Sequence, residues 1–342
     1  MPDRTDSPVQ QSHREPVLDG VRAFSIVFVL MSHWLPLNAI RPGSNQAIGE
    51  FGMALFFVLS GYLIAGQLLK RVSPRVFIAH RLARVLPLSW LIALIVGLVW
   101  AFDPPRLIAH LLFYANLPPQ QLTHPLEHYW SLCVELQFYA IAALLLCLQP
   151  RWTSLVIPAL LLLDTTYRIS QSAVNGSVTW VRADDILAGA VLVLLLNGPA
   201  RERVRGFLAA PPWPWVLPPL LYLACALPEG GNPLNYFRSY LAAAWVGSLL
   251  CQPAASPSRW LSHARWSWLA AVSFAVYILH APLAATWLGS GDLLEKYAKR
   301  PLLLAVVLLL AHLSTFYFER RFTRWARCYG ERQARNAEPS HG

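Results

Sequence analysis

Residues 130–148 read WSLCVELQFYAIAALLLCL, an apolar stretch that carries one carboxylate, Glu135. A helix over this stretch rises by about 28 Å, close to the roughly 30 Å of hydrocarbon in a bilayer. An ionisable group inside such a span is costly, so it normally faces a protein interior and serves a pathway or a reaction. The stretch therefore predicts a membrane-spanning helix with a functional carboxylate.

The overall composition agrees with a membrane protein. Of the 342 residues, 56% are hydrophobic and 13% are charged, which is too apolar for a soluble domain of this size. We predict an all-α, polytopic membrane protein of about ten transmembrane helices. The stretches that predict them are residues 22–40, 51–69, 84–102, 129–148, 153–168, 179–197, 207–228, 237–251, 267–288 and 301–318.

The basic residues predict the orientation, because Lys and Arg accumulate on the cytoplasmic side of membrane spans. With the N-terminus inside, all but eight of the 28 Lys and Arg residues fall in cytoplasmic segments. We therefore expect both termini to be cytoplasmic. The predicted organisation is a tail over residues 1–16, one transmembrane domain over residues 17–325 and a basic tail over residues 326–342, with both tails disordered.

Several classes of function are excluded by composition and motifs. The formal net charge of +10 is spread over loops that face anionic lipid, so nucleic acid is not expected as a partner. The five cysteines have no CxxC spacing, and we expect no metal site. The sequence has no Walker, GxGxxG, GxSxG or HExxH motif, which excludes the common nucleotide-binding, hydrolase and zinc-protease classes.

The first span carries two polar residues on one face. His33 follows Arg22 by eleven residues, and eleven steps of about 100° return to nearly the same side of a helix, roughly 16 Å further along. Arg22 is expected at the cytoplasmic edge of this span. His33 is then expected in the outer half of the membrane.

Four other ionisable residues are predicted at the level of His33. Glu135 lies roughly 9 Å below the outer surface, Asp184 and Asp185 descend similarly in their span, and His280 climbs to the outer half from the inside. Their convergence would form a buried acid/base site, since imidazole titrates near neutrality and a carboxylate can orient it. An intramembrane histidine can also serve only to bond a neighbouring helix, and this alternative stays open for His280.

A second group of polar residues is expected at the opposite, cytoplasmic face. Arg81 and Arg84 are spaced i and i+3, so they share one side of a helix. Paired guanidinium groups suit phosphate, which they can contact bidentately. Ordinary basic residues of the cytoplasmic side are the alternative interpretation.

Five blocks of sequence, in this order, resemble the membrane-bound acyltransferase family three, the integral-membrane O-acyltransferases that decorate bacterial surface sugars, antibiotics and nodulation factors. The blocks are LDGVRA at 18–23 with His33, LFFVLSGYLI at 55–64, Arg81-x-x-Arg84-x-x-Pro87, WSLxVExQFY at 130–139 and SFAVYILH at 273–280. The resemblance runs from about Val17 to Trp325. The chain departs from the family at Met53-Ala54 and at Leu136, where acidic residues are common.

The resemblance implies transfer of an acyl group, most often acetyl, from cytoplasmic acyl-CoA to a hydroxyl, here of a cell-surface carbohydrate. It implies a multi-pass protein of the bacterial inner membrane whose partners are acetyl-CoA, the carbohydrate acceptor and the lipid bilayer. His33 is expected as general base or acyl carrier, with Glu135 as its catalytic partner. Donor-binding residues are expected at Arg22, Arg81 and Arg84, and acceptor-binding residues at Ser60, Tyr139, Asp184, Asp185, Tyr277 and His280.

Other functions stay open at the level of sequence. The acyl donor could be succinyl or longer, and the acceptor could be a macrolide or a glycolipid. A secondary transporter would also bury His, Glu and Asp at mid-membrane, although its usual internal repeat is not visible. A non-catalytic receptor or assembly factor would not need His33 and Glu135.

Overall fold

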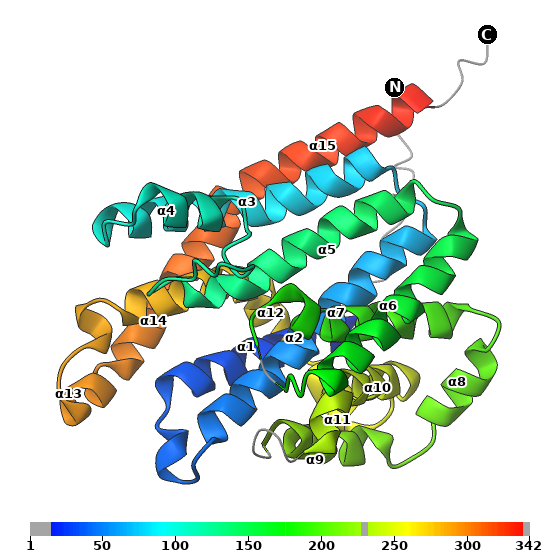
Figure 1. Ribbon diagram of the computed structural model, residues 1–342, viewed down its shortest axis with the longest axis horizontal. Helices are drawn as coiled ribbons and strands as arrows, with labels where there is room; N and C mark the ends of the chain where they lie inside the picture. Colours follow the sequence, from blue (N-terminus) through cyan, green and yellow to red (C-terminus); the bar gives the residue numbers. More distant parts are fainter. Residues whose placement is uncertain (1–14, 175, 227–231, 338–342) are drawn as a thin grey trace, which may run out of the picture.

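The computed structural model describes residues 15–174, 176–226 and 232–337, and these residues form helices and connections without any strand (Figure 1). Six helical stretches are long and apolar enough to cross a membrane. Their helices are α1 (Pro16–Trp34), α2 (Ser44–Leu69), α3 (Pro74–Val99), α5 (Trp130–Leu146), α12 (Arg265–Ala284) and α14 (Arg300–Leu313), the last continuing through the π-helical η5 (Ser314–Glu319) into α15 (Arg320–Ala337).

Four further helices occupy the remaining predicted spans. They are α6 (Pro150–Ser170), α7 (Thr179–Asn197), α9 (Trp213–Ala226) and α10 (Arg238–Cys251). All-helical architecture is thus confirmed for the described residues, whereas the crossing of the membrane by these four helices stays a prediction, as does the orientation. The connections hold the short helices α4 (Pro104–Leu111), α8 (Arg201–Leu208), α11 (Ser256–Leu261) and α13 (Leu293–Ala298), with 3₁₀ turns η1 (Leu37–Ala39), η2 (Glu127–Tyr129), η3 (Pro233–Phe237) and η4 (Trp287–Gly289).

α1 and α3 begin earlier than their hydropathy predicts, because proline sets their first turn. α1 starts at Pro16 and ends at Trp34, where the extended Leu35 precedes Pro36. The expected span 22–40 is therefore shifted, and Arg22 lies inside the helix instead of at its edge. α3 starts at Pro74, so Arg81 and Arg84 also lie within a helix.

The expected disorder of the C-terminal tail is wrong for its described part. α15 lies alongside α3 (Figure 1), and the ring nitrogen Nε2 of His80 is 2.9 Å from the carbonyl oxygen of Ala326. Residues 1–14 and 338–342 of the two predicted tails lie outside the described residues. The basic tail is thus at least partly an extension of the helical bundle.

The core is built around α2, which packs against α1 and α7 over most of its length. A Cβ atom on Gly61 would lie 1.8 Å from the carbonyl oxygen of Ile186, and one on Gly189 would lie 1.9 Å from that of Val58. The two backbones therefore approach as closely as only glycine allows. This contact fixes α2 relative to α7 and thereby positions the residues that follow on both helices.

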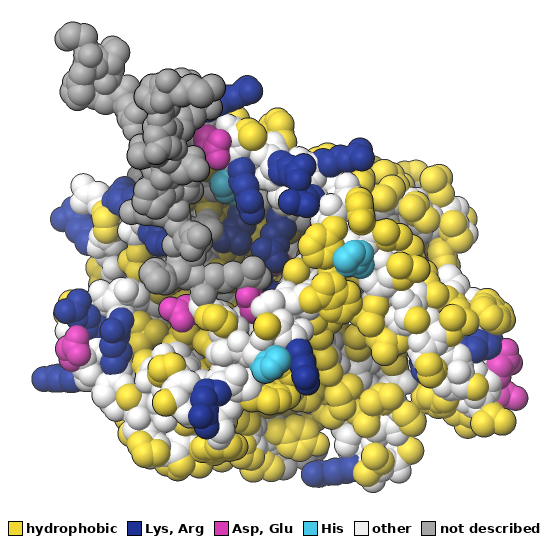
Figure 2. All heavy atoms as spheres, turned by 180° about the vertical axis from the view of Figure 1, so that it is seen from behind, with side chains coloured by type: hydrophobic (Ala, Val, Ile, Leu, Met, Phe, Trp, Pro, Cys, Tyr) yellow, Lys and Arg dark blue, Asp and Glu magenta, His cyan; other side chains and the backbone are white. Residues whose placement is uncertain are grey.

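The two ends of the bundle differ in their surroundings. We call the end with residues 35–43 and 285–300 the outer end and the end with residues 70–73 and 147–149 the inner end, after the orientation that the sequence predicts. Figure 2 shows one face on which hydrophobic side chains cover much of the surface and a large group of basic side chains gathers in the upper part. Such a surface suits contact with lipid.

Candidate active site

A cavity of about 720 Å³ opens at the outer end. Its walls come from the end of α1, the start of α2, residues 124–130, the end of α12 and the start of α14. We call it the outer cavity. Segments far apart in the sequence thus surround one space that is large enough for a sugar unit.

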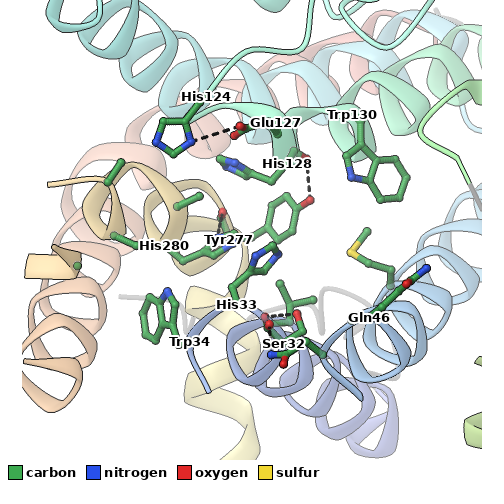
Figure 3. A pocket seen from close by; sticks show the side chains of 18 of the residues that line it. Ser32, His33, Trp34, Gln46, His124, Glu127, His128, Trp130, Tyr277 and His280 are labelled. Atoms are coloured by element: carbon green, nitrogen blue, oxygen red, sulfur yellow. Dashed lines mark hydrogen bonds and ion pairs between the residues drawn. The ribbon is translucent and has the colours of Figure 1, made fainter. Parts of the chain in front are cut away.

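Three imidazole rings lie together in the outer cavity (Figure 3). The ring centroid of His280 is 5.1 Å from that of His33 and 5.0 Å from that of His128. His280 and His128 are buried, whereas His33 is exposed to the space inside the cavity. The expected proximity of His33 and His280 is therefore present in the fold, and His128 joins them.

Hydrogen bonds hold the buried part of this cluster in place. The hydroxyl of Tyr277 donates to the carbonyl oxygen of His128 at 2.7 Å and lies 2.5 Å from Oγ of Ser131. Nδ1 of His280 is 2.6 Å from the carbonyl oxygen of Tyr277, which indicates that Nδ1 carries the hydrogen. Nε2 of His280 is buried and has no protein partner. A neutral imidazole here can accept a hydrogen bond from a bound hydroxyl.

Glu135 lies in a different cavity from His33, contrary to the predicted convergence. It lines a small space, which we call the inner cavity, together with Arg22, Arg81 and Arg84. The prediction that Glu135 lies beside His33 was wrong, because it was based on depth in the membrane alone and ignored the tilt and rotation of each helix. The structure therefore groups the predicted carboxylate with the predicted phosphate-binding arginines.

Glu135 is held by two of the residues predicted for the acceptor route. Ser60 donates to Oε1 of Glu135 at 3.1 Å, and the hydroxyl of Tyr139 donates to the same oxygen at 2.7 Å. The guanidinium group of Arg81 lies over the rings of Phe77 and Tyr139, at 5.6 and 5.5 Å. Nε of Arg81 is buried without a hydrogen-bond partner, so a donor for an anionic ligand is available there.

A third, much smaller space of about 10 Å³ shares walls with both cavities. It shares Val29, Met53 and Tyr277 with the outer cavity. With the inner cavity it shares Arg22, Phe56 and Ser273. The rings of Phe56 and Tyr277 stack at the junction, with centroids 6.2 Å apart and planes 9° apart.

One face of α1 lines all three spaces. Successive residues of that face line the inner cavity, the small space and the outer cavity in turn, namely Arg22, Ser25, Ile26, Val29, Ser32 and His33. The predicted common face of Arg22 and His33 is confirmed. The arginines of the inner cavity and the imidazoles of the outer cavity thus lie at opposite ends of one helix face.

Asp184 and Asp185 do not line any of these three spaces. Both are fully buried and bind arginines: Asp184 pairs with Arg168, and Asp185 pairs with Arg238 at 3.0 Å. The two carboxylates share Arg238, which also lies 3.6 Å from Asp184. Their observed contacts are those of an ion-pair network that joins α6, α7 and α10.

The same network reaches the outer cavity through Glu50. This carboxylate lines the cavity, forms a two-pronged pair with Arg182 and lies 3.2 Å from Arg238. Arg182 also lies under the ring of Trp130, at 5.0 Å.

Hydropathy did not single out Glu50, because it stands just before the expected span 51–69. His128 was missed for the same reason, since it stands just before 129–148.

The fold and the site define a helical, multi-pass membrane protein with two polar cavities in its bundle. The chain belongs to the family described as acyltransferase domain, whose model matches residues 15–320. It is an acyltransferase, as its five sequence blocks predicted. No group of three His, Cys, Asp or Glu side chains that could hold a metal ion occurs within the described residues.

Relatives with named activities agree with this assignment. The chain is 27% identical over 302 residues to a protein of Komagataeibacter xylinus provisionally named a membrane-bound transacylase, BcsY, covering 79% of this chain and 73% of that protein. It is 24% identical over 353 residues to peptidoglycan O-acetyltransferase OatA of Listeria monocytogenes, covering 89% of this chain and 55% of the relative. The chain thus spans about half the length of that peptidoglycan enzyme. No solved structure matches the chain.

Proposed function

We propose that this acyltransferase moves an acetyl group from acetyl-CoA, bound at the inner end, to a hydroxyl of a cell-surface carbohydrate in the outer cavity. The observation that carries the proposal is that one face of α1 runs from the cavity of Arg22, Arg81 and Arg84 to the cavity of His33. Arginines suit the phosphates of the donor. The pantetheine arm would reach the outer cavity once the side chains around the small space of about 10 Å³ move apart. The protein would act in a bacterial inner membrane with both termini in the cytoplasm.

The chemistry requires one base beside the acceptor. The imidazole of His33 takes the proton of the hydroxyl while the hydroxyl oxygen attacks the thioester carbonyl carbon. The carbon–sulfur bond then breaks, and the coenzyme A thiolate leaves and receives the proton from His33. In the other form of this mechanism His33 first carries the acyl group on its nitrogen and then passes it to the hydroxyl.

Glu135 contributes at the donor end in this proposal. It lies among three guanidinium groups, and its carboxylate offsets their charge when no donor is bound. Ser60 and Tyr139 keep the carboxylate in one position. At the acceptor end, Tyr277 and His280 line the outer cavity beside His33. Asp184 and Asp185 act on the acceptor only indirectly, by holding the arginines that position Glu50.

The acceptor hydroxyl of peptidoglycan, another polysaccharide, a glycolipid or a macrolide would undergo the same chemistry. We favour a carbohydrate because of the size and polarity of the outer cavity and because relatives are named peptidoglycan O-acetyltransferases. The acceptor is identified by the experiment that follows.

The test is acetyl transfer in membranes that carry the wild type, His33→Ala, His33→Gln or His263→Ala, with labelled acetyl-CoA. His263 is the control, because it is exposed and its Nδ1 only accepts a bond from the nearby backbone of Arg265. Loss of a general base typically costs about 10²- to 10⁴-fold in rate. Base-labile acetyl esters on host glycans are the readout.

We expect esters with wild type and His263→Ala and a loss of two orders of magnitude or more with both His33 variants at equal expression. The molecule that bears the ester identifies the acceptor. Equal labelling by wild type and the His33 variants would remove His33 from the mechanism. Consumption of acetyl-CoA without any esterified product, across isolated glycans, glycolipids and macrolides, would contradict transfer to a hydroxyl.

A further inference from the structure

The outer cavity contains cationic side chains that pair with no carboxylate of the described residues, and we propose that they form an anion subsite for the acceptor. The subsite consists of Arg300, Lys296 and the indole N–H of Trp34. It selects acceptors that carry a carboxylate or a phosphate close to the hydroxyl that is acylated. This inference rests on the proposed function for the identity of the ligand as an acceptor, but the binding itself can be measured without catalysis.

Arg300 is placed at the cavity wall by two aromatic rings. Its guanidinium carbon lies 5.9 Å from the ring centroid of Trp34 and 5.9 Å from that of Tyr297. These contacts hold the planar group in a fixed orientation, which reduces the entropy lost when a ligand binds. Both Arg300 and Trp34 line the outer cavity.

Nitrogen atoms of Arg300 and Trp34 lack hydrogen-bond acceptors. Nε and Nη1 of Arg300 and Nε1 of Trp34 are buried and make no hydrogen bond to the protein, and Trp34 is only 6% exposed. A buried donor without an acceptor is costly. Small rotations of these side chains would bring the donors to the oxygen atoms of a bound anion and satisfy them.

The charged side chains near Arg300 and Lys296 already form ion pairs with other residues. Lys299 pairs with Glu295 at 2.5 Å and donates to two backbone carbonyl groups. Of the carboxylates that line the cavity, Glu50 is paired with buried arginines and Glu127 lies 3.2 Å from His124. Within the described ranges, no acidic side chain pairs with Lys296 or Arg300. The cavity therefore has two cations that no carboxylate in the described part of the chain neutralises.

The backbone adds to this positive charge. Arg300 is the first residue of α14, which is 14 residues long, and the amide groups at the start of a helix favour a nearby anion. The ring of Trp34 is 6.5 Å from that of His280, which in turn is 5.1 Å from that of His33. The anion therefore belongs to the same sugar unit as the reacting hydroxyl, or to its neighbour.

The test measures binding to purified His33→Ala protein in detergent, so that no turnover occurs. The carboxylate probe is tetragalacturonate, with its methyl ester as the neutral match, and the phosphate probe is glucose 1-phosphate, with glucose as the neutral match. The variants are Arg300→Gln, Lys296→Gln and Arg300→Glu. Arg106→Gln is the control, because Arg106 lies at the same end, is half exposed and pairs only with Asp103 outside the cavity.

We expect one acidic probe to bind at least about 10-fold more tightly than its neutral match, as for a hydrogen bond to a charged group. Arg300→Gln should abolish this ratio, Lys296→Gln should reduce it, and Arg106→Gln should leave it unchanged. Arg300→Glu should reverse the preference, so that a glucosamine tetramer binds better than the acids. If tetragalacturonate binds more tightly than its methyl ester, the acceptor carries a carboxylate. If glucose 1-phosphate binds more tightly than glucose, the acceptor carries a phosphate.

Equal binding of both acids and their neutral matches would overturn the subsite, as would a ratio that survives Arg300→Gln. Failure of the proposed function gives a different pattern: charge-dependent binding with no acetyl transfer by the protein that retains His33. Failure of the subsite alone gives transfer that proceeds equally to acidic and neutral acceptors and does not depend on Arg300.

Discussion

At the scale of single residues, the side chains that we propose for catalysis and for donor binding lie in two cavities. His33 faces the outer cavity, whereas Arg81 faces the inner one with an unpaired Nε. A substitution at each position should therefore change a different kinetic constant, because in the proposed mechanism one residue acts on the reacting hydroxyl and the other holds the donor.

Arg81→Gln should raise the KM for acetyl-CoA by about 10-fold or more and change kcat little, because a charge-assisted hydrogen bond is worth roughly 1.5–3 kcal/mol. Initial rates over a range of donor concentrations measure both constants. Arg75→Gln is the control, since Arg75 lies on the same helix but is exposed. A large fall in kcat at unchanged KM would place Arg81 outside the donor site.

Arg238 is the residue on which the buried network depends most. It is fully buried and lies 3.0 Å from Asp185, 3.2 Å from Glu50 and 3.6 Å from Asp184. Arg238→Ala removes the nearest cation of the buried Asp185, and breaking a buried pair in this way typically costs about 3–5 kcal/mol. We expect a marked fall in the melting temperature in detergent.

The matched control is Arg201→Ala, because the Arg201–Glu202 pair is exposed and such pairs contribute at most about 1 kcal/mol. Equal melting temperatures for the Arg238 and Arg201 variants would show that the network does not stabilise the fold.

At the scale of elements, the contact between α2 and α7 depends on glycine. Gly61→Ala places a methyl group against the backbone of α7, at the position of the Ile186 carbonyl oxygen. Forcing an extra methyl group into a packed contact costs roughly 1–3 kcal/mol. We therefore expect Gly61→Ala to lower the melting temperature by several degrees.

Gly66 on the same helix provides the control. A Cβ atom there would meet no atom within 4 Å, so Gly66→Ala should be neutral or slightly stabilising, since alanine favours the helix by about 1 kcal/mol over glycine. If Gly61→Ala and Gly66→Ala melt alike, then α2 and α7 do not pack as described.

At the scale of the whole molecule, the orientation can be tested with single cysteines. Cys328 on α15 is exposed, and Ser290 is exposed at the outer end. An even number of spans with both termini inside predicts that an impermeant maleimide labels a Ser290→Cys variant in intact spheroplasts. Cys328 should react only after the membrane is opened. The other cysteines are replaced by alanine in both proteins.

The control for labelling at the outer end is a protein in which all cysteines are replaced and Ser290 is kept. Labelling of Cys328 in intact spheroplasts would contradict the predicted orientation and would place the arginine-lined cavity on the outside, away from cytoplasmic acetyl-CoA.

Much of the fold follows from local properties of the sequence. Hydropathy locates a helix at each of the predicted spans, and the errors lie at the ends. Proline sets the early starts at Pro16 and Pro74, whereas α2 begins at Ser44, directly after Gly43, instead of at residue 51. The helical period alone predicts that Arg22 and His33 share a face. The sequence blocks identify the family because they are contiguous and keep their order.

The sequence by itself determined that this is an all-helical membrane acyltransferase and that Arg22 and His33 share one face of a helix. Only the tertiary structure decided that Glu135 joins the arginines, that His128 joins His33, and that Asp184 and Asp185 are held by arginines. The physical reason is that hydropathy and helical period are properties of one segment. Which side chains meet depends on how separate helices tilt and rotate against one another, and close contacts such as Gly61 on Ile186 set that geometry.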